Sequence, residues 1–170
     1  KGVEDINKVL NNRAGKKARP VDCLDIMNLI GRIVVSGNVR RSAQIALGDI
    51  DDLQYLNAKR WDLGNIPNWR ALSNNSVVCN DINLLPEQFW NGYHGNGEPY
   101  GLVNLGLARK IGRVGEFQYP DSEVGGCNPC SEQFLENQET CCLSEVFLPN
   151  VESKEELISF EDDISNCFKN

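Results

Sequence analysis

Positive charge and long apolar runs are both scarce in this sequence. Its 170 residues carry 17 lysines and arginines against 24 aspartates and glutamates, a formal net charge of −7. A protein that binds nucleic acid by neutralising phosphates needs a broad basic surface, so we expect no nucleic acid partner. No apolar run reaches the roughly 20 residues that cross a bilayer, and the first residues lack the charged-then-apolar plan of a signal peptide. We therefore expect no membrane partner and a cytoplasmic location.

The sequence has seven cysteines, an odd number. Without a secretory signal, a disulfide framework of the secreted type is not expected, which leaves reduced, catalytic or metal-bound thiols. Cys23, Cys79 and Cys167 stand alone in stretches with apolar periodicity, and we interpret them as small buried side chains. The other four cysteines fall close together: Cys127, Cys130, Cys141 and Cys142.

Helical periodicity alternates with strand-like segments along the chain. Helices are predicted over Val3–Leu10, Val21–Ser36, Asp52–Lys59 and Pro86–Trp90. A last helix is predicted from the capping box Ser153–Glu156 onwards, and its apolar face consists of Leu157, Phe160, Ile164 and Phe168. Strands are predicted over Val39–Leu47, Ser73–Cys79, Gly101–Asn104 and Cys141–Leu148. This alternation is typical of an α/β fold with a largely parallel sheet. Residues 1–170 are expected to form a single incomplete domain, because both ends look cut inside a larger architecture.

The second helix carries an apolar stripe at helical spacing. Its members, which we expect to be buried, are Leu24, Met27, Ile30 and Val34. Asp49 follows the first predicted strand and is expected to cap the third helix.

Asn128, Cys130 and Glu132 occupy alternate positions in the segment 126–132. In an extended or looped segment alternate side chains point the same way, so one face would carry an amide, a thiol and a carboxylate. Glu132 could take a proton from a substrate hydroxyl, Asn128 could orient a neighbouring hydroxyl, and Cys130 could act between them. Cys141, eleven positions after Cys130, could supply reducing equivalents as half of a disulfide. A vicinal diol, such as that of a ribose, fits this face.

Other readings of the clustered cysteines stay open, including a pair of inert buried thiols. Cys127 and Cys130 have the spacing of half a zinc site, but the adjacent Cys141 and Cys142 would then have to reach one tetrahedral ion. The only histidine, His94, lies in a glycine-rich stretch and is expected to face solvent. The segment 127–130 also has the length of a thioredoxin-type motif, which should open a helix after a strand. None of these uses the amide and carboxylate beside the second thiol, so we expect no metal.

The segment from Asn128 to Glu132, with Cys141 downstream, resembles the catalytic loop of ribonucleotide reductases. Further short stretches of the sequence resemble the monomeric, adenosylcobalamin-dependent (class II) ribonucleoside-triphosphate reductases and occur in the same order as in that family. They are Asn11–Gly15, Asn28–Gly31, Val34–Ala43, Ala46–Gly48, Ser73–Val77, Asn96–Pro99 and Glu145–Phe147. The similarity covers nearly the whole chain and favours the cobalamin class over the di-iron class.

This resemblance implies a role for each matching residue. Cys130 would be the thiyl radical that abstracts the 3′-hydrogen of a ribonucleotide. Glu132 would be the base on the 3′-hydroxyl, and Asn128 would hydrogen-bond the substrate. Cys141 would be one of two thiols that reduce the 2′-position. The implied cofactor is adenosylcobalamin, and the implied fold is part of a ten-stranded α/β barrel with the loop inside it.

The resemblance also implies partners, and this sequence departs from the family's pattern at three positions. The partners would be a ribonucleotide substrate, the remainder of the reductase chain and a thioredoxin-like reductant. The second reducing cysteine and most cofactor contacts have no counterpart here, so we expect a central slice that is inactive alone. Cys127, Ser131 and Cys142 replace a non-thiol residue, a common glycine and an asparagine. The change at Ser131 bears on the backbone conformation of the loop, and we interpret the two extra thiols as harmless.

Overall fold

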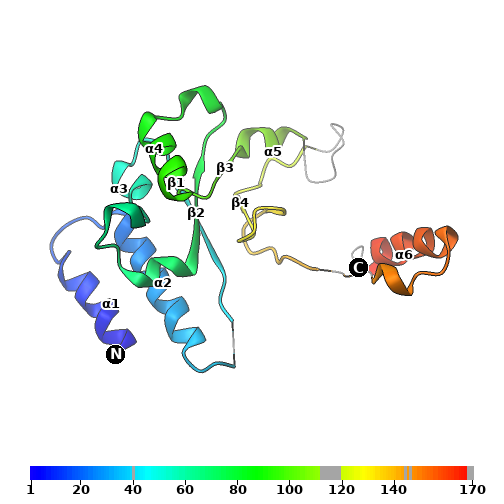
Figure 1. The fold of residues 1–170 in the computed structure, drawn as a ribbon, viewed down its shortest axis with the longest axis horizontal. Coiled ribbons are helices and arrows are strands. Elements are labelled where there is room, and N and C mark those ends of the chain that lie inside the picture. Colours follow the sequence, from blue (N-terminus) through cyan, green and yellow to red (C-terminus); the bar gives the residue numbers. More distant parts are fainter. Residues whose placement is uncertain (40, 112–119, 144, 146, 168–170) are drawn as a thin grey trace. The chain divides into compact units, whose positions relative to one another are not determined.

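The computed structural model describes residues 1–39, 41–111, 120–143, 145 and 147–167 (Figure 1). The chain divides into two compact units, residues 1–139 and 140–170. That residues 1–170 form part of a single domain stays a prediction.

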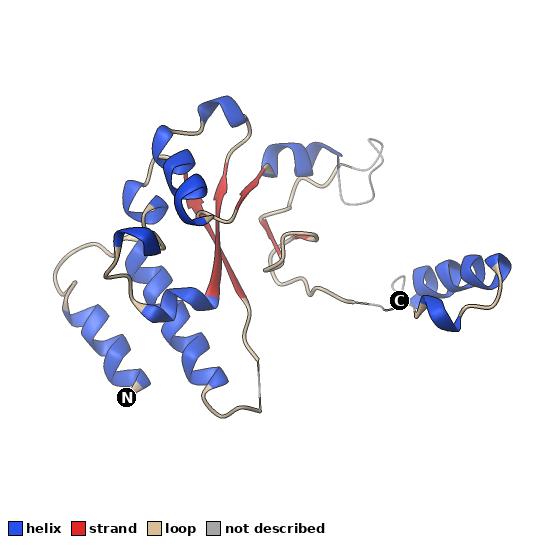
Figure 2. Ribbon diagram, viewed as in Figure 1, coloured by secondary structure: helices blue, strands red, loops and turns tan. Residues whose placement is uncertain are grey.

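A parallel three-stranded sheet forms the centre of the first unit (Figure 2). Its strands are β1 (Gln44–Asp49), β2 (Ser73–Val78) and β3 (Gly101–Val103), in the order β1-β2-β3. The register pairs Ile45 with Asn74 and Val77 with Leu102. The predicted α/β class with parallel strands is confirmed, although β1 begins five residues later than Val39. Within the described residues the sheet is open and does not close into a barrel.

Helices form where the apolar periodicity predicts them. The predicted ones are α1 (Gly2–Asn11), α2 (Pro20–Val35), α3 (Leu53–Leu56), which is shorter than predicted, and α4 (Glu87–Asn96). Helix α5 (Leu105–Ile111) was not predicted. Asp52, and not Asp49, caps α3, because its carboxylate accepts from the backbone N–H groups of Gln54 and Tyr55. Helix α4 runs past its predicted end and stops at Gly97, whose φ of 72° suits a glycine C-cap.

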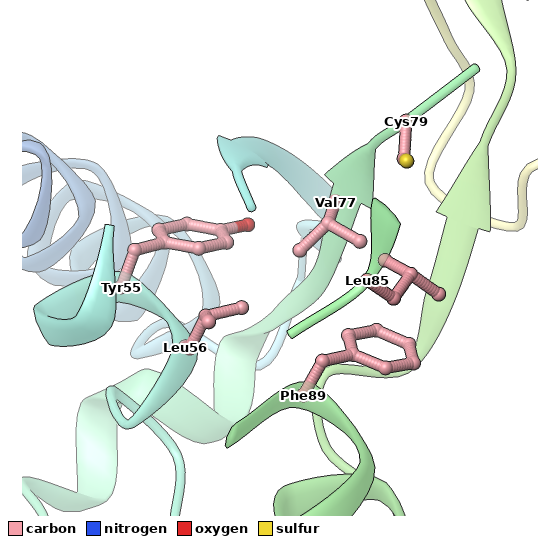
Figure 3. Packing of buried hydrophobic residues seen from close by; sticks show 6 residues of the cluster. All are labelled: Tyr55, Leu56, Val77, Cys79, Leu85 and Phe89. Carbon is pink, nitrogen blue, oxygen red and sulfur yellow. The ribbon is translucent and has the colours of Figure 1, made fainter. Parts of the chain in front are cut away.

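One face of the sheet is covered by helices. Side chains from α3, β2, α4 and the segment between β2 and α4 form a buried cluster there (Figure 3): Tyr55, Leu56, Val77, Cys79, Leu85 and Phe89. The Tyr55 hydroxyl lies 2.6 Å from the carbonyl of Ala46 and 2.9 Å from that of Ser76. These contacts join α3 to both β1 and β2.

The buried side of α2 differs from the predicted stripe. Leu24 is buried, but Met27, Ile30 and Val34 are 53%, 41% and 41% exposed. The buried residues also include Val21, Leu29 and Asn28, whose side-chain amide donates to the hydroxyl of Ser73 at 3.0 Å. Because a buried amide must find hydrogen-bond partners, α2 turns this residue towards β2 and its apolar stripe away.

The second unit contains α6 (Lys154–Cys167), which confirms the predicted helix. Ser153 Oγ accepts from the N–H of Glu156 at 3.1 Å, as the predicted capping box requires. The strand predicted over Cys141–Leu148 is wrong at its described positions, because the unit offers no described strand to pair with it. Two of its side chains, Leu143 and Phe147, are exposed. Ser144, Val146 and Phe168 lie outside the described residues.

Candidate active site

A short antiparallel hairpin carries the predicted loop. Its strands are β4 (Gly126–Cys127) and β5 (Phe134–Leu135), and residues 128–133 connect them. The N–H of Gly125 donates to the carbonyl of Leu135 at 3.0 Å and extends the pairing by one residue. The hairpin belongs to the first unit.

Asn128 holds the loop closed. Its N–H donates to the carbonyl of Gln133 at 2.9 Å, and the N–H of Gln133 donates back to Asn128 Oδ1 at 3.0 Å. The N–H of Ser131 donates to the carbonyl of Asn128 at 2.9 Å, which closes a tight turn across Pro129 and Cys130. The loop is therefore a turn, and the expected alternation of an extended segment does not describe it.

Ser131 takes a left-handed backbone conformation, with φ of 68°. Glycine adopts this conformation at no steric cost, whereas a residue with a side chain is strained by about 1–2 kcal/mol. This conformation gives a physical reason for the glycine that the resemblance implies at this position. Ser131 keeps the turn, and its hydroxyl lies 3.8 Å from the sulfur of Cys127.

The turn brings two of the predicted site residues together. Asn128 Nδ2 donates to Glu132 Oε1 at 2.5 Å. Asn128 is buried, while Glu132 and Cys130 are exposed to solvent. An amide held against a carboxylate, next to an exposed thiol, can orient and deprotonate a hydroxyl of a ligand that reaches the turn.

The hairpin packs on the face of the sheet opposite to α3 and α4. Successive residues of a strand point to opposite faces, so Val77 meets the helices and Val78 meets the hairpin. The second buried cluster consists of Val103, Leu105, Ala108, Val124 and Cys127, with Ile45, Leu47, Val78 and Phe134 packed against it. The sequence did not predict this hairpin, because two-residue strands carry too little periodicity.

The cysteines outside the turn have different surroundings. Cys79 and Cys127 are buried, and burial raises the pKa of the Cys127 thiol. Cys127 therefore serves as a packing residue, consistent with a harmless extra thiol. Cys23 is exposed, contrary to the prediction, because it lies on the side of α2 away from Asn28. The side chain of Cys167 lies outside the described residues.

Cys141 and Cys142 lie in the second unit. Cys141 is partly buried, and Cys142 is exposed with its sulfur 3.7 Å from the hydroxyl of Thr140. The predicted roles of Asn128, Cys130, Glu132 and Cys141 in one reaction stay predictions.

The described part of the chain was expected to hold no metal and to have no membrane partner. No three histidine, cysteine, aspartate or glutamate side chains gather there in a way that could hold a metal ion. His94 is exposed, as predicted, but lies within α4 and stacks on Trp90. Among the described helices, none is both long and apolar enough to span a bilayer.

Sequence reasoning missed Asn74. This β2 residue donates from Nδ2 to the carbonyl of Pro129 at 2.8 Å and so joins the sheet to the turn. The available signal was the run of four polar residues, Ser73–Ser76, at the start of a strand beside a buried core.

Comparison with known proteins finds adenosylcobalamin-dependent ribonucleoside-triphosphate reductases. The chain is 46% identical over 145 residues to that of Lactobacillus leichmannii, 47% to that of Lactobacillus acidophilus and 44% to that of Levilactobacillus brevis. Each match covers 84% of this chain and 19% of the relative, so the chain spans about a fifth of the length of these enzymes. No family model and no solved structure matches.

Proposed function

Because the chain is homologous to a segment of the adenosylcobalamin-dependent ribonucleoside-triphosphate reductases, we propose that it is part of a ribonucleotide reductase. Such an enzyme converts ribonucleotides to deoxyribonucleotides. In this proposal the chain supplies the turn with the radical-bearing cysteine and does not turn over alone. The observation that carries the proposal is the amide–carboxylate pair Asn128–Glu132 beside the exposed thiol of Cys130.

Cys130 begins the reaction as a thiyl radical. It abstracts the 3′-hydrogen of the ribose, forming an S–H bond and leaving a radical at C3′. The exposure of its thiol on a turn supports this role, because the sulfur must approach a sugar carbon closely. After reduction, the same thiol returns the hydrogen to C3′ and becomes a thiyl radical again.

Glu132 and Asn128 act on the hydroxyl groups. Glu132 accepts the proton of the 3′-hydroxyl, and Asn128 donates a hydrogen bond that holds the carboxylate and the substrate in place. The 2.5 Å contact between the two side chains and the burial of Asn128 support this assignment. A buried amide fixed at both ends costs little reorganisation when charge develops.

Cys141 supplies half of the reducing power. The 2′-hydroxyl leaves as water, and Cys141 with a second thiol from the rest of the enzyme gives up two electrons and two protons. The net reaction turns a ribonucleotide and two thiols into a deoxyribonucleotide, a disulfide and water. A thioredoxin-like dithiol then reduces the disulfide by exchange, in the cytoplasm.

The described residues fit adenosylcobalamin in one respect: the thiol that would receive the radical is exposed. When bound, the cofactor supplies that radical by homolysis of its cobalt–carbon bond. The relatives are adenosylcobalamin-dependent, which favours this class over the di-iron class. The placement of helices on one face of the sheet and the hairpin on the other supports a partial α/β barrel with the turn inside.

Cysteine-to-serine variants of the assembled reductase test the proposal. Cys130→Ser should abolish deoxynucleotide formation from a ribonucleoside triphosphate in the presence of adenosylcobalamin. Cys142→Ser is the matched control, because it removes another exposed thiol and should retain turnover. Turnover by the Cys130→Ser enzyme, or stoichiometric zinc in the purified protein, would favour a non-catalytic module instead.

A further inference from the structure

We propose that Asn74 is a positioning residue for the turn that carries Cys130. Asn74 lies 55 positions before Pro129 in the chain, yet its Nδ2 is 2.8 Å from the Pro129 carbonyl oxygen. The inference rests on the proposed function of that turn and assigns a role outside it. Asn74 contacts the turn and not the reacting groups.

The hydrogen bonds of Asn74 define the orientation of its amide. A carbonyl oxygen only accepts, so the atom that faces Pro129 must be the Nδ2 donor. Asn74 Oδ1 then accepts from the hydroxyl of Ser76 at 2.8 Å. Ser76 is fully buried and stands two positions along the same strand, so both side chains lie on the face that carries the hairpin.

The contact reaches the peptide group next to the thiol. The Pro129 carbonyl belongs to the peptide bond whose nitrogen is that of Cys130, and the proline ring fixes φ at Pro129. Asn128 closes the turn internally, while Asn74 ties it to the central strand β2. Loss of the Asn74 contact therefore frees the turn to tilt on the sheet, which loosens its internal hydrogen bonds and moves the Cys130 sulfur.

Asn74→Asp in the assembled reductase tests this role. The variant keeps the size of the side chain but sets an oxygen against the Pro129 carbonyl. A tilt of ~1 Å should lower kcat by roughly tenfold or more and change KM by less than about threefold, because the substrate still binds but the sulfur is displaced. Backbone amide exchange of residues 128–133, read by mass spectrometry, should rise without any substrate or cofactor present.

Asn137→Asp is the matched control, because it makes the same change at an exposed position two residues after β5. If Asn74→Asp fails to fold by circular dichroism, Asn74→Ala removes the donor without adding charge. The role is overturned if the folded variant matches the control within about twofold in kcat and in exchange of residues 128–133. Turnover by Cys130→Ser would instead remove the proposed function, while the exchange measurement would still report on the Asn74 contact.

Discussion

Replacing Asn128 by aspartate removes the amide that faces Glu132 and leaves the shape of the side chain unchanged. The Oδ1 atom that accepts from the N–H of Gln133 is retained, so the turn should still close. The lost contact is a 2.5 Å hydrogen bond to a carboxylate. A hydrogen bond to a charged group contributes about 1.5–3 kcal/mol, which corresponds to a loss in kcat/KM of about 10- to 150-fold.

Contact with solvent weakens the hydrogen bond between Asn128 and Glu132 and so lowers the expected loss in kcat/KM. Because Glu132 is exposed, we expect the lower part, about 10- to 30-fold in kcat/KM. Deoxynucleotide formation by the assembled reductase is the assay, and Asn137→Asp controls for the added charge. A value for Asn128→Asp within about twofold of that control would refute the reasoning that the Asn128–Glu132 contact orients the base.

Three further predictions concern stability and thiol chemistry. Hydrogen bonds from the Arg19 side chain lower the pKa of Asp22 to about 2. Asp22→Asn should therefore lower the unfolding free energy, measured in urea, by about 1–2 kcal/mol at pH 7. The difference between the two proteins should vanish as the pH falls from about 4 to 2, and an unchanged difference at pH 2 would contradict this prediction. Burial raises the pKa of Cys127, so iodoacetamide should label it more slowly than the exposed cysteines. Equal labelling rates, measured by mass spectrometry, would contradict this prediction. Lys59→Met should lower the unfolding free energy by about 3 kcal/mol, since it leaves the partly buried Glu98 without its ion-pair partner. The double variant with Glu98→Gln should recover part of this loss, and no recovery would contradict the role of the pair.

The helices other than α5, and the parallel strands, could be predicted because each has a strong local signal. Helix α2 shows the limit of such signals, since a polar residue, Asn28, is among its fully buried ones and donates to Ser73. Apolar spacing alone favoured the side with Met27 and Ile30. The segment from Cys141 shows another limit, because an apolar run forms a strand only where another strand pairs with it.

For the candidate site, the sequence indicated the residues but not their arrangement. The spacing of Asn128 and Glu132 correctly placed them together, although a tight turn and not an extended strand does so. The contact from Asn74 could not be predicted, because it joins residues 55 positions apart. Tertiary hydrogen bonds of this kind leave no periodic pattern in the sequence.

The distance from Cys130 Sγ to C3′ of a bound ribonucleotide tests the central claim most directly. A structure of the assembled reductase with substrate should place these two atoms about 3–3.5 Å apart, with Glu132 within hydrogen-bonding reach of the 3′-hydroxyl. A ribose bound elsewhere, or a sulfur that faces away from Asn128 and Glu132 in that complex, would contradict it.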